Sequence, residues 1–198
     1  MDEILRNIID GWGYAGVFLS MILESVCLPA ASETAMSFSG FLASTGRFDI
    51  WTVIFLGIMG DLLGAVLSYS IGYYWGSSLL LRCGRYLLIT EKDIKILESW
   101  FANQGERVIF LSRNVPIVRT FISLPAGIGR MNVLRFMAYT AVGSLPWCMV
   151  LVCMGLFMGE EWQGIKGIFY NLNMIVGIFL LILLGIFIGT RLKRERLV

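Results

Sequence analysis

The sequence contains no histidine and few charged residues of either sign. Only 15% of its 198 residues are charged, whereas 57% are hydrophobic and the mean hydropathy is +0.76. A soluble domain of this length could not bury so much apolar surface, so we expect a single membrane-embedded domain. Without histidine, any protonation switch has to depend on carboxylates.

Other absences exclude further classes of protein. No CxxC motif and no DxD pair occur, so a disulfide framework, a zinc site and two-metal phosphatase chemistry have no support. The net charge is +2, and no Lys/Arg block is interleaved with aromatics, which argues against a nucleic-acid partner. The N-terminus opens with acidic residues and lacks a basic leader, so we expect no cleaved signal peptide. We expect neither a cofactor nor a metal, beyond coupling to protons or another cation.

Three segments are long and apolar enough to span a bilayer. Ile50 to Leu81 carries only one charge, Asp61. Met131 to Met158 carries only Arg135, near its start, and Ile168 to Thr190 carries no charge. We therefore expect an all-α membrane protein with three or more spanning helices.

A polar stretch, Arg82 to Arg107, separates the first two of these segments. Its sequence TEKDIKILESWFANQG predicts an amphipathic helix on the membrane surface, ending at Gly105. This stretch and the C-terminal RLKRERLV are rich in Lys and Arg, so both are expected on the cytoplasmic side. The predicted location is a cell membrane, crossed several times, with a cytoplasmic C-terminus.

Two remaining apolar stretches are broken by proline and charge. Val17 to Thr45 contains Pro29, and Val108 to Gly129 contains Pro116 and Pro125. Because the charges place both ends of the second stretch on the cytoplasmic side, we expect it to enter the membrane and return. Both stretches are predicted to be re-entrant hairpins that enter from opposite sides and meet near the bilayer centre.

An internal repeat supports two facing hairpins. A shift of 83 residues along the chain aligns Gly60 with Gly143 and Gly72 with Gly155, and a FLS tripeptide lies upstream of each copy. The charge bias makes the two copies run in opposite directions, and inverted repeats with broken helices are typical of transporters. We expect one domain made of repeat one (about 17–76), a connector (about 77–107), repeat two (about 108–159) and a C-terminal spanning helix (about 168–190).

Five charged residues fall at membrane depth: Arg113, Arg119, Glu24, Glu33 and Asp61. Charges there are costly and usually mark a functional site. One interpretation is that they pair and lock the hairpins together; we favour the other, a polar site on a transport path. Proline lies between the two arginines and between the two glutamates, and a break at each proline would let each pair converge.

Arginine binds phosphate or carboxylate through a planar fork, so the two arginines suit an anionic headgroup. We expect Arg113, Arg119, Glu24 and Glu33 to bind substrate, with Glu24, Glu33 and Asp61 as candidates for proton coupling. Without histidine, the usual phosphatase chemistry is excluded, so no catalytic residue is expected.

The motifs resemble those of the DedA family of small integral membrane proteins. They are ESVCLPAASE (Glu24 to Glu33), SYSIGYYWG (Ser68 to Gly76), FLSRNVPIVRTFISLPAG (Phe110 to Gly127) and the Met131 to Phe136 segment, over roughly Gly13 to Gly159. The family's acids match Glu24 and Glu33, and its arginines match Arg113 and Arg119. Family members often carry a further acid where this chain has Ala65; here the acid is Asp61, one turn earlier, so the resemblance assigns Asp61 no role.

The resemblance implies facing re-entrant hairpins and lipid translocation. Some bacterial members translocate undecaprenyl phosphate, and the two arginines favour this substrate. The alternative is a flippase or scramblase for phosphatidylethanolamine or bulk phospholipid. A structural or partner-binding membrane protein is a remoter alternative, and association into a homo-oligomer is left open.

Overall fold

In the computed structural model, the described residues are 2–27, 31–76, 91–115, 118–159, 174–175 and 178. Their regular structure is helical throughout, with no strand in these ranges. The elements are α1 (Asp2–Trp12), α2 (Tyr14–Cys27), α3 (Ala31–Ser44), α4 (Ile50–Ile71), the π-helical turn η1 (Gly72–Gly76), α6 (Glu91–Ser112), α7 (Val118–Phe121), α8 (Ser123–Ile128) and α9 (Val133–Met158). The prediction of an all-α protein is confirmed for this part of the chain.

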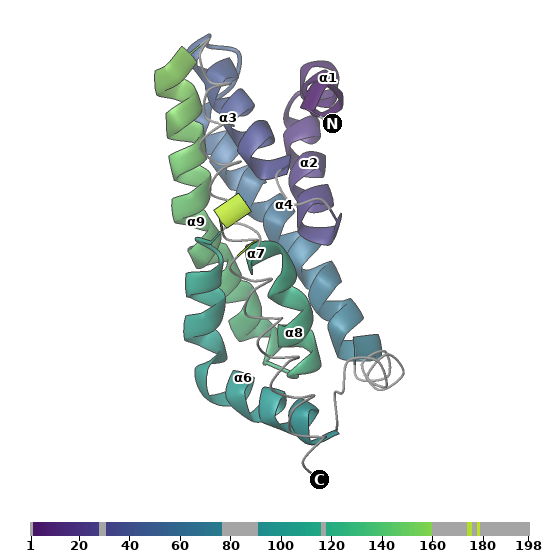
Figure 1. Cartoon of the computed structure of the whole chain (residues 1–198). Coiled ribbons are helices and arrows are strands. Elements are labelled where there is room, and N and C mark those ends of the chain that lie inside the picture. The colour runs from purple at the N-terminus through teal and green to yellow at the C-terminus, as the bar shows by residue number, and fades with distance from the viewer. Residues whose placement is uncertain are drawn as a thin grey trace.

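The two long helices α4 and α9 run in opposite directions over most of the length of the molecule (Figure 1). Together with η1, α4 forms an apolar helix of 27 residues, and α9 has 26 residues. At 1.5 Å per residue, each is about 40 Å long, more than the hydrocarbon thickness of a bilayer. Two of the three predicted spans thus have matching helices; the third, Ile168 to Thr190, lies outside the described residues except for three helical positions.

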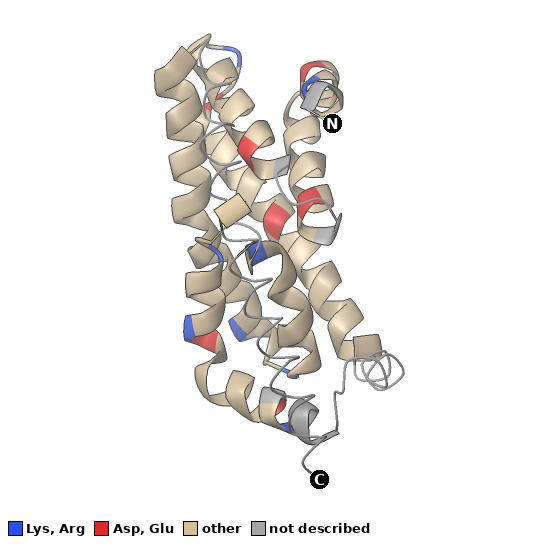
Figure 2. Ribbon diagram, in the orientation of Figure 1, with Lys and Arg blue, Asp and Glu red and all other residues tan. Residues whose placement is uncertain are grey.

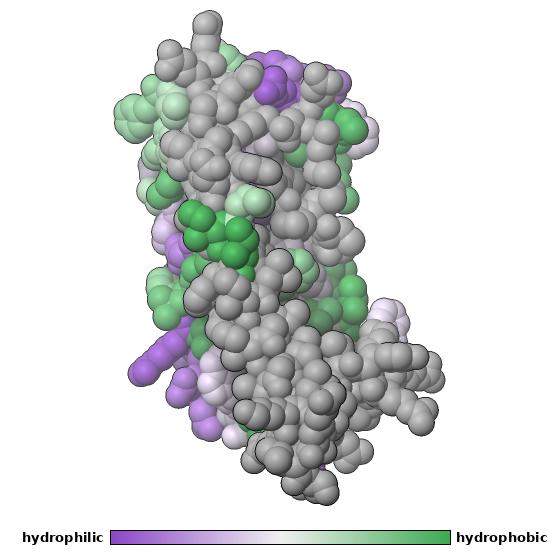
Figure 3. Space-filling view, viewed as in Figure 1, coloured by the Kyte–Doolittle hydropathy of each residue, from purple (hydrophilic) through white to green (hydrophobic). Residues whose placement is uncertain are grey.

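Both long helices present apolar side chains outward, as lipid-facing helices do. Phe55 and Leu67 of α4 are 62% and 52% exposed, and Leu134 and Phe157 of α9 are 72% and 84% exposed. In Figure 3, green hydrophobic atoms lie at mid-height, and purple hydrophilic atoms lie near the upper and lower ends.

Each long helix begins at a side-chain cap. Asp49 accepts a hydrogen bond from the Thr52 backbone N–H at 2.8 Å, and this bond holds the pKa of Asp49 below its usual value. Asn132 accepts from the backbone N–H groups of Leu134 and Arg135, so α9 begins at Val133. The shift that aligns Gly60 with Gly143 also aligns Asp49 with Asn132.

Two pairs of shorter helices pack beside the long ones. In Figure 1, α2 and α3 occupy the upper half, and α7 and α8 occupy the lower half. Helix α2 packs on α4 and α6 packs on α9, so each of these helices contacts the long helix of its own half of the chain. Helices α3 and α8 are exchanged: α3 packs on α9, and α8 packs on α4. Each long helix therefore contacts one arm from its own half of the chain and one arm from the other half.

The aligned glycines make equivalent close contacts. A Cβ placed on Gly60 would lie 2.7 Å from the Phe18 carbonyl oxygen, and one on Gly143 would lie 3.1 Å from the Phe110 carbonyl oxygen. Phe18 and Phe110 begin the two FLS tripeptides. Close packing of backbones, which only glycine allows here, therefore occurs at corresponding places in the two halves.

Helix α6 differs from the expectation. It continues without interruption from Glu91 to Ser112, and its ribbon bends so that one arm lies across the lower end while the other ascends beside α9 (Figure 1). The prediction that it ends at Gly105 is wrong. Gly105 is buried within the helix, and a Cβ there would lie 3.0 Å from the Met131 sulfur, so this glycine serves packing and not termination.

The apolar core has two parts. The upper part joins Val53 and Ile54 of α4 to side chains of α1, α2, α3 and α9, and the lower part joins Ala65 and Tyr69 of α4 to α6, α8 and α9. Asp61 lies between the two parts on α4 and is completely buried. The core is therefore interrupted by a polar layer near its middle, where Figure 2 shows red and blue segments surrounded by tan helices.

Candidate functional site

The centre of the polar layer is Asp61, which holds both arginines. The Nη1 atom of Arg113 and the Nη2 atom of Arg119 each lie 3.3 Å from the same Asp61 oxygen, Oδ1. All three side chains are at most 3% exposed. Because ion pairs are weakly screened in such a buried place, these contacts fix the positions of both guanidinium groups.

The two predicted glutamates lie at one side of this centre. Glu24, which is 3% exposed, has its Oε2 atom 3.6 Å from the Arg119 Nη2 atom. Glu33 is 6% exposed, lies within 3.5 Å of the Ser32 hydroxyl, and interacts electrostatically with Glu24 and Arg119. The structure thus brings the predicted residues together, and it places Asp61, expected only as a candidate for proton coupling, at their centre.

Hydroxyl groups complete the hydrogen bonding of the ion pairs. Ser25 donates to Asp61 Oδ1 at 2.8 Å, and Ser144 donates a short hydrogen bond to Asp61 Oδ2. Arg113 Nη2 donates to the hydroxyls of Ser123, at 3.0 Å, and Thr140, at 3.3 Å. The hydroxyls come from α2, α8 and α9, so three helices besides α4 contribute to the site.

Two aromatic rings lie against the arginines. The Arg113 Cζ atom is 5.9 Å from the centroid of the Phe136 ring, and the Arg119 Cζ atom is 5.6 Å from that of Trp147. Both rings lie on α9 and are almost fully buried. Stacking on a ring stabilises a guanidinium while leaving its in-plane N–H donors available.

Some of those donors are unused. Arg113 Nε and Arg119 Nη1 are buried and have no hydrogen-bond partner, and the Glu24 Oε2 atom accepts no hydrogen bond. Buried polar atoms are nearly always satisfied in native proteins, so unpaired donors on two adjacent guanidinium groups call for an explanation. A bound anion would supply the missing acceptors.

The cluster also has an excess of acidic groups. Two guanidinium groups face three carboxylates, those of Asp61, Glu24 and Glu33. Such a group is neutral only when one carboxylate holds a proton or a cation is bound. Among the described residues, no group of three Cys, Asp or Glu side chains is arranged to hold a metal ion.

Local chain breaks position the arginines. Arg113 follows the last residue of α6, and its backbone N–H donates to the Ile109 carbonyl at 3.2 Å; Arg119 lies in α7. The expected breaks at Pro29 and Pro116 lie outside the described residues. At Ser112 to Val118 the chain nevertheless leaves one helix and enters another, which puts both arginines beside Asp61.

Pro125 does not act as predicted. It lies in the first turn of α8, where the chain continues in the same direction as α7 and does not reverse. Having no N–H, Pro125 cannot donate to the Phe121 carbonyl, which accounts for the interruption between α7 and α8 at Ile122. The expectation of a hairpin break at Pro125 is therefore wrong.

The sequence held a signal for the contact between Asp61 and Ser144, which was not predicted. Asp61 and Ser144 stand 83 residues apart, directly after the aligned glycines Gly60 and Gly143. Two positions that an internal repeat aligns, in helices that cross, are candidates for mutual contact. The hydroxyl donors Ser25 and Thr140 carry no comparable signal.

Comparisons with known proteins agree with this picture. Residues 28–157 match the family described as the VTT domain. The chain is 33% identical over 168 residues to undecaprenyl phosphate transporter A of Bacillus subtilis, covering 85% of this chain and 82% of that protein. It is 32% identical over 200 residues to an alkaline phosphatase-like protein of Lactococcus lactis, covering 96% and 94%.

Protein DedA of Escherichia coli is 30% identical over 153 residues, covering 75% of this chain and 69% of that protein. No solved structure matches the chain. The matched domain extends from the connection after α2 to the last turn of α9 and so includes Asp61 and both arginines. This chain therefore belongs to the DedA family, the membrane proteins that carry a VTT domain.

Proposed function

We propose that this protein carries an anionic lipid phosphate, preferably undecaprenyl phosphate, between the leaflets of the bacterial cytoplasmic membrane. The observation that carries the proposal is the pair of buried arginines sharing one oxygen of Asp61, each with an unused N–H donor. Two relatives, from Bacillus subtilis and Staphylococcus aureus, are named undecaprenyl phosphate transporter A.

In this proposal, α2–α3 and the α6–α8 segment are re-entrant hairpins of an inverted repeat. The equivalent glycine contacts and the exchanged packing of α3 and α8 support it. Helices α2 and α3 have 14 residues each, about 21 Å, which is too short for a full crossing. Their ends would lie at mid-depth, where the protein and not lipid covers the irregular backbone.

In the absence of substrate, the carboxylates of Asp61 and Glu24 bind the guanidinium groups that the phosphate would bind. In the state described by the structure, one nitrogen of each arginine makes these contacts: Arg113 Nη1 lies 3.3 and 3.5 Å from the two Asp61 oxygens, and Arg119 Nη2 lies 3.3 Å from Asp61 and 3.6 Å from Glu24. A phosphate offers more acceptors in the geometry that a guanidinium fork prefers, so it competes with the carboxylates for the same donors. This exchange provides a bound and an empty form of one site, as a carrier requires.

Proton coupling follows from the charge balance. The cluster already has three carboxylates against two guanidinium groups, so a phosphate adds negative charge in a place of low dielectric. Protonation of Glu24 or Glu33, or entry of another cation, would offset that charge. The lipid would then move with protons, and the transmembrane proton gradient would bias its direction.

The orientation is assigned from the charge distribution. Helix α6, which lies at the lower end in Figure 1, carries Lys95 and Arg107, and it binds Arg130 and Arg135 through its Glu98 and Glu106; the chain ends in RLKRERLV. The positive-inside rule then places this end, and the C-terminus, in the cytoplasm.

The test is transport of defined lipids by the purified protein in proteoliposomes. Undecaprenyl phosphate should change leaflets, and the variant with Arg119→Gln should leave it where it was placed. Equal movement of phosphatidylethanolamine would favour the scramblase alternative. Release of inorganic phosphate would contradict a carrier and indicate hydrolysis, for which the short hydrogen bond from Ser144 to Asp61 offers a nucleophile and a base.

A further inference from the structure

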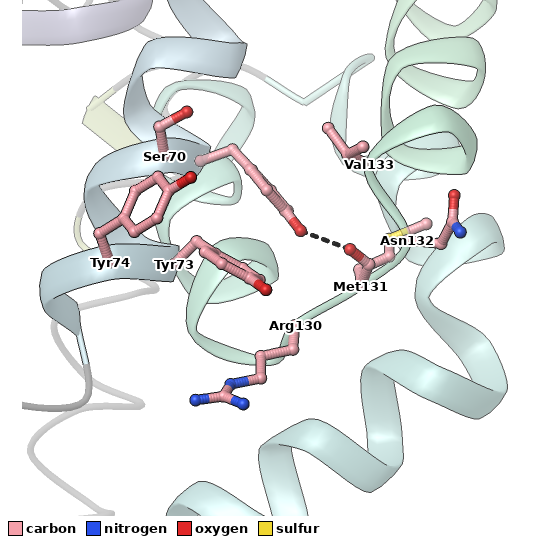
Figure 4. Close-up of a pocket in the computed structure, with 8 residues that line it drawn as sticks. Ser70, Tyr73, Tyr74, Arg130, Met131, Asn132 and Val133 are labelled. Atoms are coloured by element: carbon pink, nitrogen blue, oxygen red, sulfur yellow. Dashed lines mark hydrogen bonds between the residues drawn. The ribbon is translucent and has the colours of Figure 1, made fainter.

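A cleft outside the buried site opens at the end of the molecule where α6 lies (Figure 4). It has a volume of about 380 Å³, and Tyr73 and Tyr74 of η1 face Arg130 and Asn132 across it. Its floor is Tyr69, whose hydroxyl donates a short hydrogen bond to the Met131 carbonyl. The buried Tyr69 ring is therefore held in place as one wall of the cleft.

The backbone on both sides of this cleft is unusual. Tyr73 and Tyr74 lie in the π-helical turn, a form that is rare and common at functional sites. Across from them, Arg130 has φ 49°, and no other described non-glycine residue has a positive φ. Arg130 directly follows Gly129, the C-cap of α8, and the Met131 N–H donates to the Ala126 carbonyl at 3.2 Å, so this left-handed residue ends the helix.

The position of the Arg130 side chain favours binding of an anion. The guanidinium is 66% exposed and lies over the Tyr73 ring, with 5.9 Å between Cζ and the ring centroid. Its contact with Glu98 is long, 3.7 Å between Nε and Oε1, so the ion pair is weak and easily replaced. The arginine fork and the exposed aromatic rings beside it match a phosphate attached to a lipid chain at the membrane interface.

The cleft and the buried arginines are separated by one aromatic layer. The Tyr69 ring packs on the Phe136 ring with 4.8 Å between centroids, and the Arg113 Cζ atom lies 5.9 Å from the Phe136 centroid. Phe136 is fully buried. A headgroup in the cleft is thus one ring pair away from Arg113.

We infer that the cleft is a second, interfacial binding site for the phosphate headgroup of the transported lipid, with the Tyr69–Phe136 ring pair as the barrier between this site and the buried arginines. The inference rests on the proposed function for the identity of its ligand. It assigns Arg130 to binding at the cytoplasmic leaflet, where the lipid enters or leaves the path.

The experiment uses the full chain in lipid nanodiscs with a photoreactive farnesyl phosphate. Mass spectrometry should find the label on the Gly72 to Gly76 or the Arg130 to Val133 segment. Unlabelled farnesyl phosphate should displace it, inorganic phosphate should do so only weakly, and farnesol should not. Displacement by farnesol as strong as by farnesyl phosphate would mean a purely apolar groove, and equal displacement by inorganic phosphate would mean a free-phosphate site; either overturns the inference.

Three variants sharpen the test. Arg130→Gln should weaken labelling and raise the KM of transport roughly tenfold, because a charge-assisted contact is lost. Glu98→Gln should strengthen labelling and lower the KM, since it removes the competing carboxylate. Arg135→Gln is the matched control: Arg135 is also 66% exposed and also paired with a glutamate, Glu106, but it does not line the cleft, so neither quantity should change.

The outcomes separate the two proposals. Labelling of the cleft that depends on Arg130, in a protein that moves no lipid phosphate, would support the cleft and contradict the proposed function. Lipid transport with an unchanged KM in the Arg130→Gln variant, and no label in the cleft, would overturn the cleft site and leave the proposed function standing.

Discussion

Ser144 donates a hydrogen bond to Asp61, and the two residues stand 83 positions apart, the same separation that aligns the glycines preceding them. Asp61 belongs to α4 and Ser144 to α9, so the contact joins the two long helices at corresponding points. A contact between equivalent positions is expected near a pseudo-twofold axis. The asymmetry of the pair is informative, because only one of the two positions carries the acid that holds both arginines.

The first prediction concerns Asp61. Asp61→Asn removes the charge that both Arg113 and Arg119 contact, so two buried guanidinium groups lose their shared partner. Breaking a buried pair costs about 3–5 kcal/mol, so we expect a clearly lower thermal unfolding temperature in detergent, together with loss of transport. Asp10→Asn is the comparison, since Asp10 pairs with Arg47 at the exposed surface and its loss should lower the unfolding temperature much less.

The second prediction tests the close helix contacts. Gly60→Leu places a side chain where a Cβ alone would lie 2.7 Å from the Phe18 carbonyl oxygen, so α2 and α4 must separate. We expect destabilisation of about 1–3 kcal/mol or more, measured by thermal or denaturant unfolding in detergent. In the control Gly11→Ala, nothing lies within 4 Å of the added Cβ, and stability should be unchanged or slightly higher.

The third prediction concerns pH. If Glu24 or Glu33 takes up a proton in each cycle, transport of lipid phosphate varies with pH, because the charged cluster accepts a further anion only when a proton accompanies it. Gln cannot ionise, so Glu24→Gln or Glu33→Gln should flatten the pH profile in proteoliposomes. Profiles that keep the wild-type shape in both single variants would exclude proton coupling through these residues.

The fourth prediction concerns topology. With the α6 end in the cytoplasm, a cysteine placed at Val198 should react with a membrane-impermeant reagent only after cells are opened. A cysteine at Gly46, on the turn before α4 at the opposite end, should react in intact cells. The reverse pattern at both positions would invert the assigned orientation.

Much of this architecture could be predicted from the sequence, for reasons that are physical. Charge-free segments as long as α4 and α9 have few alternatives to a membrane helix, and five buried charges in so apolar a chain have to meet. The sequence did not reveal which acid would be central, because Asp61 on α4 meets Arg113, which follows α6, and Arg119 in α7 only in the tertiary structure, a relationship that local spacing does not encode.

The same limit explains the errors at Gly105 and Pro125. Glycine can end a helix or allow close packing. At Gly105 the nearby Met131 sulfur shows that the glycine allows close packing. Proline can break a helix or occupy its first turn, and the start of α8 at Ser123 decides for Pro125. Glycine and proline can each have either of two structural roles in a helix. Which role applies depends on residues that are distant in the sequence.

The last prediction separates a phosphate site from a structural lock. If Arg113 and Arg119 grip a phosphate, charge alone is insufficient, because lysine keeps the charge but loses the planar fork. Each Arg→Lys change should then weaken transport strongly, and each Arg→Ala change should abolish it, while the protein still inserts in the membrane. Transport in proteoliposomes and thermal unfolding of the same preparations provide the two measurements.

If instead the arginines only balance the acids, removing both members of a pair should restore the fold and the function. The contacts identify the pairs to neutralise as Asp61→Asn with Arg113→Gln, and Glu24→Gln with Arg119→Gln. We expect both double variants to be more stable than the single arginine variants, since no buried charge is left alone, and yet inactive, since the phosphate has lost its donors. A neutralised pair that transports lipid phosphate at the wild-type rate would mean that the arginines are scaffolding, and the substrate would have to bind elsewhere.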